Sequence, residues 1–253
     1  MNNIWYSFLI TSFAGFSTLI GILLIFFRFN NKNKVILSSL AFASGVMLTV
    51  SVVDLIPSAI NGFLKEYCLI PTLLLTIIFV ILGICMSILI NKYIPDVGNI
   101  EDNQKGLFRV GLISMVAIIL HNIPEGIATF MTTTQNIELG LSLALAIALH
   151  NIPEGISISV PIYYSTQSKF KAFLYTFVSG LSEPLGAIIA YLFLSPYVND
   201  LIMSIILAVI AGIMTYIALY ELMPASFKYN NIKLTLKYLV FGSFFMMICH
   251  FIL

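Results

Sequence analysis

The sequence predicts an all-α integral membrane protein with eight transmembrane helices. Three observations lead to this fold class: 60% of the 253 residues are hydrophobic, only 9% are charged, and the apolar residues gather in eight long runs. An average soluble domain carries about 25% charged residues, and a helix needs ~20 apolar residues to cross a bilayer core about 30 Å thick. The composition therefore excludes a soluble enzyme.

The eight runs follow one another with connections too short to hold a separate domain. We therefore interpret residues 1–253 as one transmembrane domain. The first run is not expected to be a cleavable signal peptide, because no basic residue precedes it. The expected spans cover about 4–27, 35–60, 68–90, 107–130, 138–165, 169–194, 200–224 and 234–253.

The basic residues predict the orientation, because Lys and Arg that flank spans are retained on the cytoplasmic side. Alternate connections hold eleven of the twelve Lys and Arg residues, and Lys65 is the exception. Both termini are therefore expected outside the cell membrane.

The polar connection at about 91–106 is expected to be a flexible cytoplasmic tether. A formal net charge of +1 argues against a nucleic-acid partner.

The cysteines give no sign of a disulfide framework or a thiolate metal site. Cys68, Cys85 and Cys249 each stand alone in an apolar stretch, without a Cys-x-x-Cys pattern. We expect all three to be small buried hydrophobic residues.

One motif occurs twice without change. The six residues His-Asn-Ile-Pro-Glu-Gly at 121–126 recur at 150–155, 29 residues later, near the middle of two adjacent spans. Adjacent spans run in opposite directions, so the two copies form an inverted-topology repeat. Positions i and i+4 share a helix face about 6 Å apart. His121 with Glu125, and His150 with Glu154, therefore form two clamps of an imidazole and a carboxylate.

Other residues of the motifs add to the expected site. Asn122 and Asn151 lie next to the clamps and offer amide oxygens. Pro124 and Pro153 lack an N–H group, so we expect each helix to be loosened at the site. The sixth span also combines a glutamate with a proline, in the segment Ser-Glu-Pro-Leu-Gly at 182–186.

A weaker repeat relates the second span to the seventh at a constant offset of 167. It pairs Gly45, Met47, Asp54, Leu55 and Pro57 with Gly212, Met214, Glu221, Leu222 and Pro224. The two spans run in opposite directions, which places Asp54 toward the outer end and Glu221 toward the cytoplasmic end. A central site between inverted repeats, with an acid near each mouth, is typical of a secondary transporter.

Five of the eleven acidic residues fall inside spans, where no Lys or Arg lies deep enough to pair with them: Asp54, Glu125, Glu154, Glu183 and Glu221. A carboxylate at the bilayer centre costs at least ~3 kcal/mol. A protonated, hydrogen-bonded acid that stabilises a helix contact would explain a single Glu. Three Glu residues joined by two His residues favour a metal cation instead. Asp54 and Glu221 remain open to interpretation as helix-end polarity.

Imidazole and carboxylate ligands without thiolate suit zinc, iron(II), cobalt, nickel or manganese, and disfavour copper(I). The three central Glu residues carry a charge of −3, so one divalent ion leaves −1 and two leave +1. Both one and two ions are therefore compatible with the sequence. No prosthetic group is expected.

The paired motifs, the 182–186 segment and the eight spans resemble the ZIP (Zrt/Irt-like) metal-ion transporters, closest to the bacterial ZupT-like branch. This resemblance extends over essentially the whole chain. It implies a 3+2+3 helix arrangement, a homodimer in the lipid bilayer, and movement of the first, fourth, fifth and sixth spans against the rest. The implied cargo is Zn²⁺, with Fe²⁺, Mn²⁺, Co²⁺ and Cd²⁺ as further divalent ions taken up into the cytoplasm.

The resemblance also implies roles for individual residues. The first metal position falls on His121, Glu125, His150, Glu154 and Glu183. The second falls on Asn122, Asn151, Glu154 and Glu183, with Glu125 able to share it. Asp54 resembles an entrance acid and Glu221 an exit acid. Some relatives have Gln at the position of His150 and Asp at the position of Asn151, which leaves the occupancy of the second position open.

Three other interpretations stay open. A membrane-embedded di-iron enzyme would also use inward carboxylates and histidines, but typically as Glu-x-x-His. An intramembrane zinc protease is less favoured, because His-Glu-x-x-His is absent. Export through the same ligands is equally compatible with the motifs.

His250, near the end of the last span, is expected to be an isolated histidine at the membrane interface.

Overall fold

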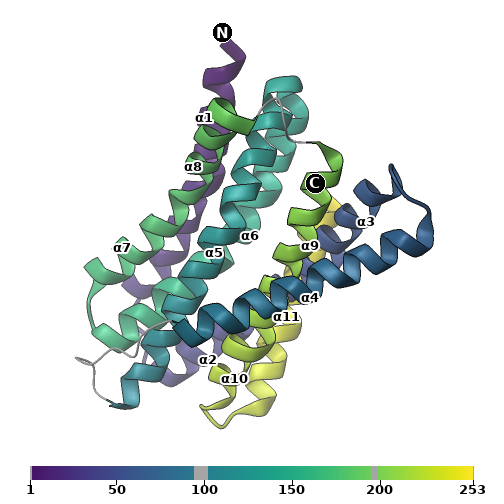
Figure 1. Cartoon of the computed structure of the whole chain (residues 1–253). Coiled ribbons are helices and arrows are strands. Elements are labelled where there is room, and N and C mark those ends of the chain that lie inside the picture. The colour runs from purple at the N-terminus through teal and green to yellow at the C-terminus, as the bar shows by residue number, and fades with distance from the viewer. Residues whose placement is uncertain (1, 94–101, 195–198, 253) are drawn as a thin grey trace.

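The computed structural model describes residues 2–93, 102–194 and 199–252, and within these residues every element is helical (Figure 1). The elements are α1 (Asn2–Phe16), η1 (Ser17–Phe26), α2 (Lys32–Thr49), η2 (Val50–Leu55), α3 (Ile56–Leu64), α4 (Leu69–Tyr93), α5 (Asp102–Gln135), α6 (Ile137–Thr166), α7 (Lys169–Gly180), α8 (Ser182–Ile189), η3 (Ala190–Leu194), α9 (Asp200–Tyr216), η4 (Ile217–Leu222), α10 (Met223–Phe227) and α11 (Ile232–Ile252).

These elements join into eight helices that are long and apolar enough to cross a membrane, as the sequence predicts. The helices extend further than the apolar runs: the second runs from Lys32 to Leu64 and the third from Leu69 to Tyr93. The expected loop at 91–106 is thereby shortened from both sides, and its residues 94–101 lie outside the described part of the chain.

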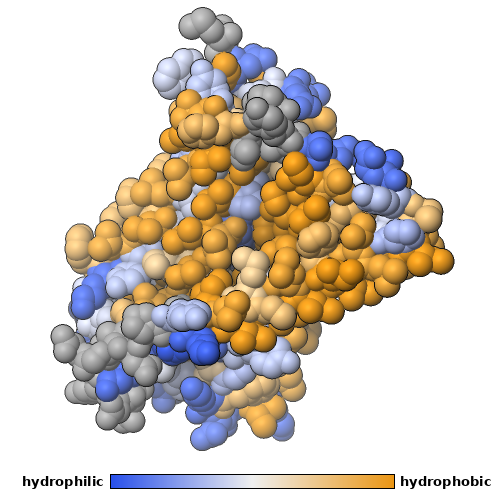
Figure 2. All heavy atoms as spheres, in the orientation of Figure 1, coloured by the Kyte–Doolittle hydropathy of each residue, from blue (hydrophilic) through white to orange (hydrophobic). Residues whose placement is uncertain are grey.

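An even number of crossings places both chain ends at the same end of the bundle. We call this end the terminal side. The opposite end carries the connections at 27–31, 167–168 and 228–231, and we call it the basic side. Between these ends, Figure 2 shows a broad hydrophobic band with hydrophilic residues gathered above and below it. The band fits a bilayer, in which apolar side chains face lipid tails rather than water.

Polar caps explain why several helices begin where they do. The side chains of Asn31, Asn136, Ser168 and Asn199 accept hydrogen bonds from backbone N–H groups in the first turns of α2, α6, α7 and α9. Each cap satisfies donors that a helix start leaves free. At its other end α6 stops at Gln167, whose positive φ of 52° turns the chain out of the helix.

The helices pack in two groups. In one group, α1 and η1 pack against α5, α6, α7 and α8; in the other, α2 packs against α11, and α4 and α3 pack against α9. The largest hydrophobic core cluster lies mainly on the basic side, where it includes buried residues between 108 and 118 of α5, between 158 and 162 of α6 and between 36 and 47 of α2. Met47 and Met214, which the weaker repeat pairs, are both buried there.

The weaker repeat has a direct counterpart in the backbone. Residues Val50–Leu55 and Ile217–Leu222 form π-helical turns, and they are related by the same offset of 167. A proline follows each turn, in the first turn of the next helix: Pro57 and Pro224. Short π-helical segments often occur at functional sites. Asp54 and Glu221 both lie within these turns.

Two expectations are only partly right. α5 and α6 stay continuous helices through Pro124 and Pro153, so these prolines do not interrupt them. The sixth span is interrupted, at Leu181, between α7 and α8.

Cys249 is buried as expected, whereas Cys68 and Cys85 are exposed on the surface of the bundle. Cys68 directly precedes the strongly apolar α4, and Cys85 lies within this helix, where an exposed residue would face lipid.

Candidate metal centre

Seven polar side chains gather where α5, α6 and α8 meet, near the middle of the bundle. Every one of them is buried. We call them the central cluster: His121, Asn122 and Glu125 on α5, His150, Asn151 and Glu154 on α6, and Glu183 on α8. The repeated motifs bring them together, because the two copies lie on adjacent antiparallel helices and the third segment packs against α5.

Imidazole and carboxylate groups form the first part of the central cluster. Nε2 of His150 lies 3.1 Å from Oε1 of Glu125, and Nε2 of His121 lies 3.2 Å from the same oxygen. Glu154 approaches the same nitrogen of His121, with Oε1 3.6 Å from Nε2. Ligand atoms of His121, Glu125 and His150 all lie within 4.8 Å of one another. One small cation could therefore contact all three.

Glu183 and the two asparagines form the second part. Asn151 donates through Nδ2 to Oε1 of Glu183, and Asn122 donates to the same oxygen at 3.4 Å. The Nδ2 group of Asn151 also donates to the carbonyl oxygen of Ala14 on α1, at 2.9 Å. Because a carbonyl oxygen only accepts hydrogen bonds, this contact determines which end of the amide faces α1. The second part therefore links α1, α5, α6 and α8.

Several ligand-type atoms of the central cluster have no hydrogen-bond partner in the described part of the chain. They are Nδ1 and Nε2 of His121, Oδ1 of Asn122, Oδ1 of Asn151, both carboxylate oxygens of Glu154 and Oε2 of Glu183. Buried polar atoms without partners are rare in native proteins, and a bound ion is one recognised reason for them. An unpaired buried carboxylate is especially costly. The arrangement thus supplies the ligands, charge and enclosure that a divalent cation requires.

The glycine of each motif copy allows a neighbouring backbone to approach closely. A Cβ added to Gly126 would lie 2.1 Å from the carbonyl oxygen of Glu183, and one added to Gly155 would lie 1.9 Å from that of Thr18. Neither position has room for a larger residue. Close helix packing through small residues is common in membrane proteins. These contacts bring α8 against α5 and η1 against α6 beside the central cluster.

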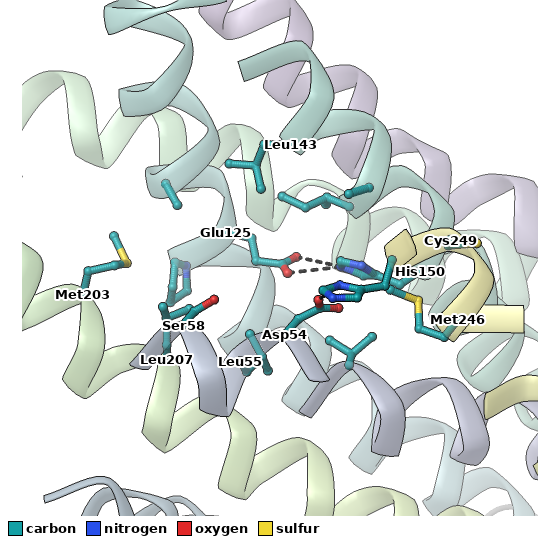
Figure 3. Close-up of a pocket in the computed structure, with 16 residues that line it drawn as sticks. Asp54, Leu55, Ser58, Glu125, Leu143, His150, Met203, Leu207, Met246 and Cys249 are labelled. Atoms are coloured by element: carbon teal, nitrogen blue, oxygen red, sulfur yellow. Dashed lines mark hydrogen bonds and ion pairs between the residues drawn. The ribbon is translucent and has the colours of Figure 1, made fainter. Parts of the chain in front are cut away.

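A cavity of about 340 Å³ leads toward the central cluster from the terminal side. It is lined by residues between 124 and 128 of α5, 143 and 150 of α6, and 246 and 250 of α11. Figure 3 shows the carboxylates of Asp54 and Glu125 and the imidazole of His150 facing the same space. The cavity therefore connects Asp54 with two members of the central cluster.

Asp54 has a partner that the sequence did not indicate. Nδ1 of His250 on α11 contacts Oδ1 of Asp54 in η2, and both residues line the cavity. The side chain of Asp54 is 29% exposed and that of His250 is 38% exposed, so the pair is partly accessible. The expectation that His250 stands alone is wrong. We call these two residues the mouth pair.

Glu221 lies on the basic side, apart from the cavity lining. Its Oε1 accepts a hydrogen bond of 2.7 Å from Nδ2 of Asn91 at the end of α4. Arg109 of α5 donates to Oδ1 of Asn91 at 2.8 Å and also to its backbone oxygen. We call Asn91, Arg109 and Glu221 the basic-side triad. Sequence reasoning missed Asn91 and the contact of Arg109, which is one of the eleven basic residues of the alternate connections.

Comparisons with known proteins point to one family. The model of the ZIP zinc transporter family matches residues 98–250. A zinc transporter ZupT of Clostridium perfringens is 39% identical over 96% of this chain and 94% of its own length. Zinc transporters ZupT of Oceanobacillus iheyensis and Streptococcus mutans are 40% and 41% identical, each over 96% of both chains.

Proposed function

Because the chain belongs to the ZIP zinc transporter family and is a transporter rather than an enzyme, we propose that it carries Zn²⁺ through the central cluster. Family membership removes the di-iron enzyme and protease alternatives. The relatives are named as zinc transporters and match nearly the full chain, which supports zinc as the cargo.

The observation that carries the proposal is the set of buried ligand atoms without partners in the central cluster. Among the described residues, neither carboxylate oxygen of Glu154 and neither ring nitrogen of His121 has a hydrogen-bond partner. A Zn²⁺ ion is bound by imidazole nitrogen and carboxylate oxygen at about 2.0–2.2 Å. Binding would compensate the cost of burying these groups in a protein interior.

Two positions for metal are proposed within the cluster. The first uses His121, Glu125, His150, Glu154 and Glu183, and the second uses Asn122, Asn151, Glu154 and Glu183, with Glu125 able to bridge. The tight group of His121, Glu125 and His150 supports the first position. Both asparagine amides donate to Oε1 of Glu183. Oδ1 of each asparagine and Oε2 of Glu183 have no hydrogen-bond partner among the described residues, which supports the second position. The same donor chemistry accommodates Fe²⁺, Mn²⁺, Co²⁺ and Cd²⁺.

The proposed route runs from Asp54, through the central cluster, to Glu221. The terminal side faces the outside of the cell membrane, so that both termini are extracytoplasmic and transport is uptake. The protein works as a homodimer with a 3+2+3 helix arrangement, and access alternates between the two sides. The cavity from Asp54 to Glu125 and His150 supports the first half of this route.

Zinc uptake into liposomes tests the proposal. Purified full-length protein is reconstituted around a zinc-sensitive dye, and the wild type is compared with Glu154→Gln, Glu154→Ala and His150→Ala. Glu138→Gln is the matched control, because Glu138 lies in the first turn of the same helix and is exposed. We expect dye signal in the wild type and in Glu138→Gln, and its loss in the other three variants. Full uptake by Glu154→Ala would overturn the proposed site.

A further inference from the structure

We propose that the mouth pair, Asp54 and His250, forms an additional metal position outside the central cluster. It would hold a partly hydrated divalent cation before the ion reaches Glu125 and His150. This inference rests on the proposed function, because it assumes that zinc reaches the central cluster through the cavity. It adds a residue, His250, to the ligands of the route.

The location of the mouth pair supports this role. Among the described residues that line the cavity, those with acidic, imidazole or thiol side chains are Asp54, Glu125, His150, Cys249 and His250. Glu125 and His150 belong to the central cluster. Asp54 lies in η2, in the terminal-side half of the second span, and His250 lies near the end of α11. An ion entering from that side would meet the mouth pair in the same cavity as two of its later ligands.

The chemistry of the pair fits a transient position. It offers one carboxylate and one imidazole, which are the ligand types of the central cluster and suit zinc. Partial exposure leaves room for water molecules to complete the coordination. Two protein ligands bind more weakly than the larger set in the central cluster, so an ion could be passed on.

A pseudo-twofold relation within the second helix group gives independent support. A Cβ added to Gly45 of α2 would lie 2.1 Å from the carbonyl oxygen of Leu239 of α11. A Cβ added to Gly212 of α9 would lie 2.1 Å from the carbonyl oxygen of Val80 of α4. The offset from α2 to α9 is again 167, and the offset from α4 to α11 is 159.

A second pair of close contacts follows the same two offsets. Gly242 of α11 approaches the carbonyl oxygen of Phe42 of α2, at 2.2 Å from an added Cβ. Gly83 of α4 approaches the carbonyl oxygen of Val209 of α9, at 1.9 Å. At these two close contacts, the packing of α2 on α11 is therefore repeated in the packing of α9 on α4.

These offsets relate the two mouths. Adding 167 takes Asp54 to Glu221, and subtracting 159 takes His250 to Asn91. Both acids contact the residue at the equivalent position of the neighbouring helix: Asp54 contacts His250, and Glu221 accepts a hydrogen bond from Asn91. The mouth pair is thus one copy of a repeated structural pairing.

The two copies differ in the residue that contacts the acid, and this difference favours metal binding by the mouth pair over a purely structural contact. An amide is sufficient to tether Glu221, and Arg109 further supports the amide of Asn91. At the equivalent position the terminal side has an imidazole, which supplies a nitrogen ligand that an amide lacks. A tether alone does not require that ring.

Zinc binding to a protein without a working central cluster tests the inference. Full-length protein with Glu125→Gln and Glu154→Gln is equilibrated with radioactive zinc in detergent. We expect residual weak binding of one ion, which disappears when His250→Gln is added. Absence of residual binding, or its persistence after Asp54→Asn and His250→Gln together, would overturn the additional position. Thermal unfolding of each variant verifies that it is folded.

Uptake kinetics then separate a ligand from a tether. We expect His250→Gln to raise the KM for zinc at least about tenfold, the lower end of effects on metal affinity from lost supporting groups, with little change in kcat. His250→Asp restores a metal ligand and should bring KM back toward the wild-type value. The double variant Asp54→Asn with His250→Gln keeps two hydrogen-bonding side chains. An unchanged KM in this variant would show that the pair only links η2 to α11 and does not bind metal.

The two proposals fail in different ways. Absence of zinc uptake by the wild type would overturn the proposed function itself. Uptake by the wild type that is lost in Glu154→Gln, but is insensitive to both residues of the mouth pair, would overturn the additional metal position and leave the central cluster in place.

Discussion

The two halves of the molecule share a repeated scaffold but give different access to the central cluster. On the terminal side, a cavity passes the mouth pair and reaches Glu125 and His150. On the basic side, the largest hydrophobic core cluster packs between the helices, and Glu221 is engaged by Asn91 and Arg109. The same offsets of 167 and 159 describe both halves, so the backbone repeat alone does not determine which side is open.

What differs is the side-chain content of each half. Between the motifs and the basic side, α5 and α6 contribute buried apolar residues such as Ile113, Ile118, Ile158 and Ile162. Such tight packing excludes water and ions. On the proposed route, an ion could reach the basic side only if this packing opened. The repeat therefore supplies two similar acid-containing ends, and side-chain packing determines which of them is connected to the central cluster.

The largest expected contrast is in the reactivity of cysteines placed in the two halves. In a cysteine-free background, Ala146→Cys lies in the cavity wall, and Ala117→Cys lies in the core cluster. We expect a charged thiol reagent to label Ala146→Cys rapidly and Ala117→Cys hardly at all, measured by mass spectrometry. Zinc should slow the labelling of Ala146→Cys. Equal rates at the two positions would break the comparison.

A smaller contrast is expected in the response to pH on the two sides. Imidazole binds metal only when neutral, and its usual pKa is about 6.5. Lowering the pH on the terminal side of proteoliposomes from 7.5 to 5.5 should therefore reduce initial zinc uptake about tenfold. The same change on the basic side should have less effect. Uptake that stays flat with terminal-side pH would argue against histidine ligands during transport.

The smallest expected effect concerns the basic-side triad. Arg109→Gln removes the charge that supports Asn91, and a partly exposed charge contact contributes about 1 kcal/mol or less. We expect a rise of up to about fivefold in labelling of Ala117→Cys, because the basic side would open more often. Lys171→Gln, which removes an exposed charge of α7 on the same side, is the control. A larger rise in Lys171→Gln would show that the triad does not hold this side closed.

Much of the central cluster could be predicted because it depends on local spacing. The i and i+4 positions of each motif place His121 with Glu125 and His150 with Glu154 on one helix face, and the repeat brings the two helices together. Eight spans followed from the lengths of the apolar runs. The weaker repeat also indicated that Asp54 and Glu221 lie at opposite ends of the bundle, as the structure shows.

Contacts between distant elements could not be predicted in this way. His250 reaches Asp54 from a helix almost 200 residues later, and Asn91 reaches Glu221 across 130 residues. Both depend on how α11 and α4 pack, which hydropathy does not specify. The offset of 159 between α4 and α11 is visible only after the close glycine contacts are known. The π-helical turns likewise leave no clear signal in an apolar sequence.

The central claim is that the buried imidazole and carboxylate groups hold the transported ion. X-ray absorption of purified protein loaded with one zinc ion per chain tests it most directly. We expect nitrogen and oxygen ligands at about 2.0–2.1 Å with scattering from imidazole rings, and a clear loss of the imidazole signal in the double variant His121→Ala with His150→Ala. A sulfur ligand at about 2.3 Å, or an unchanged spectrum in that double variant, would contradict the account.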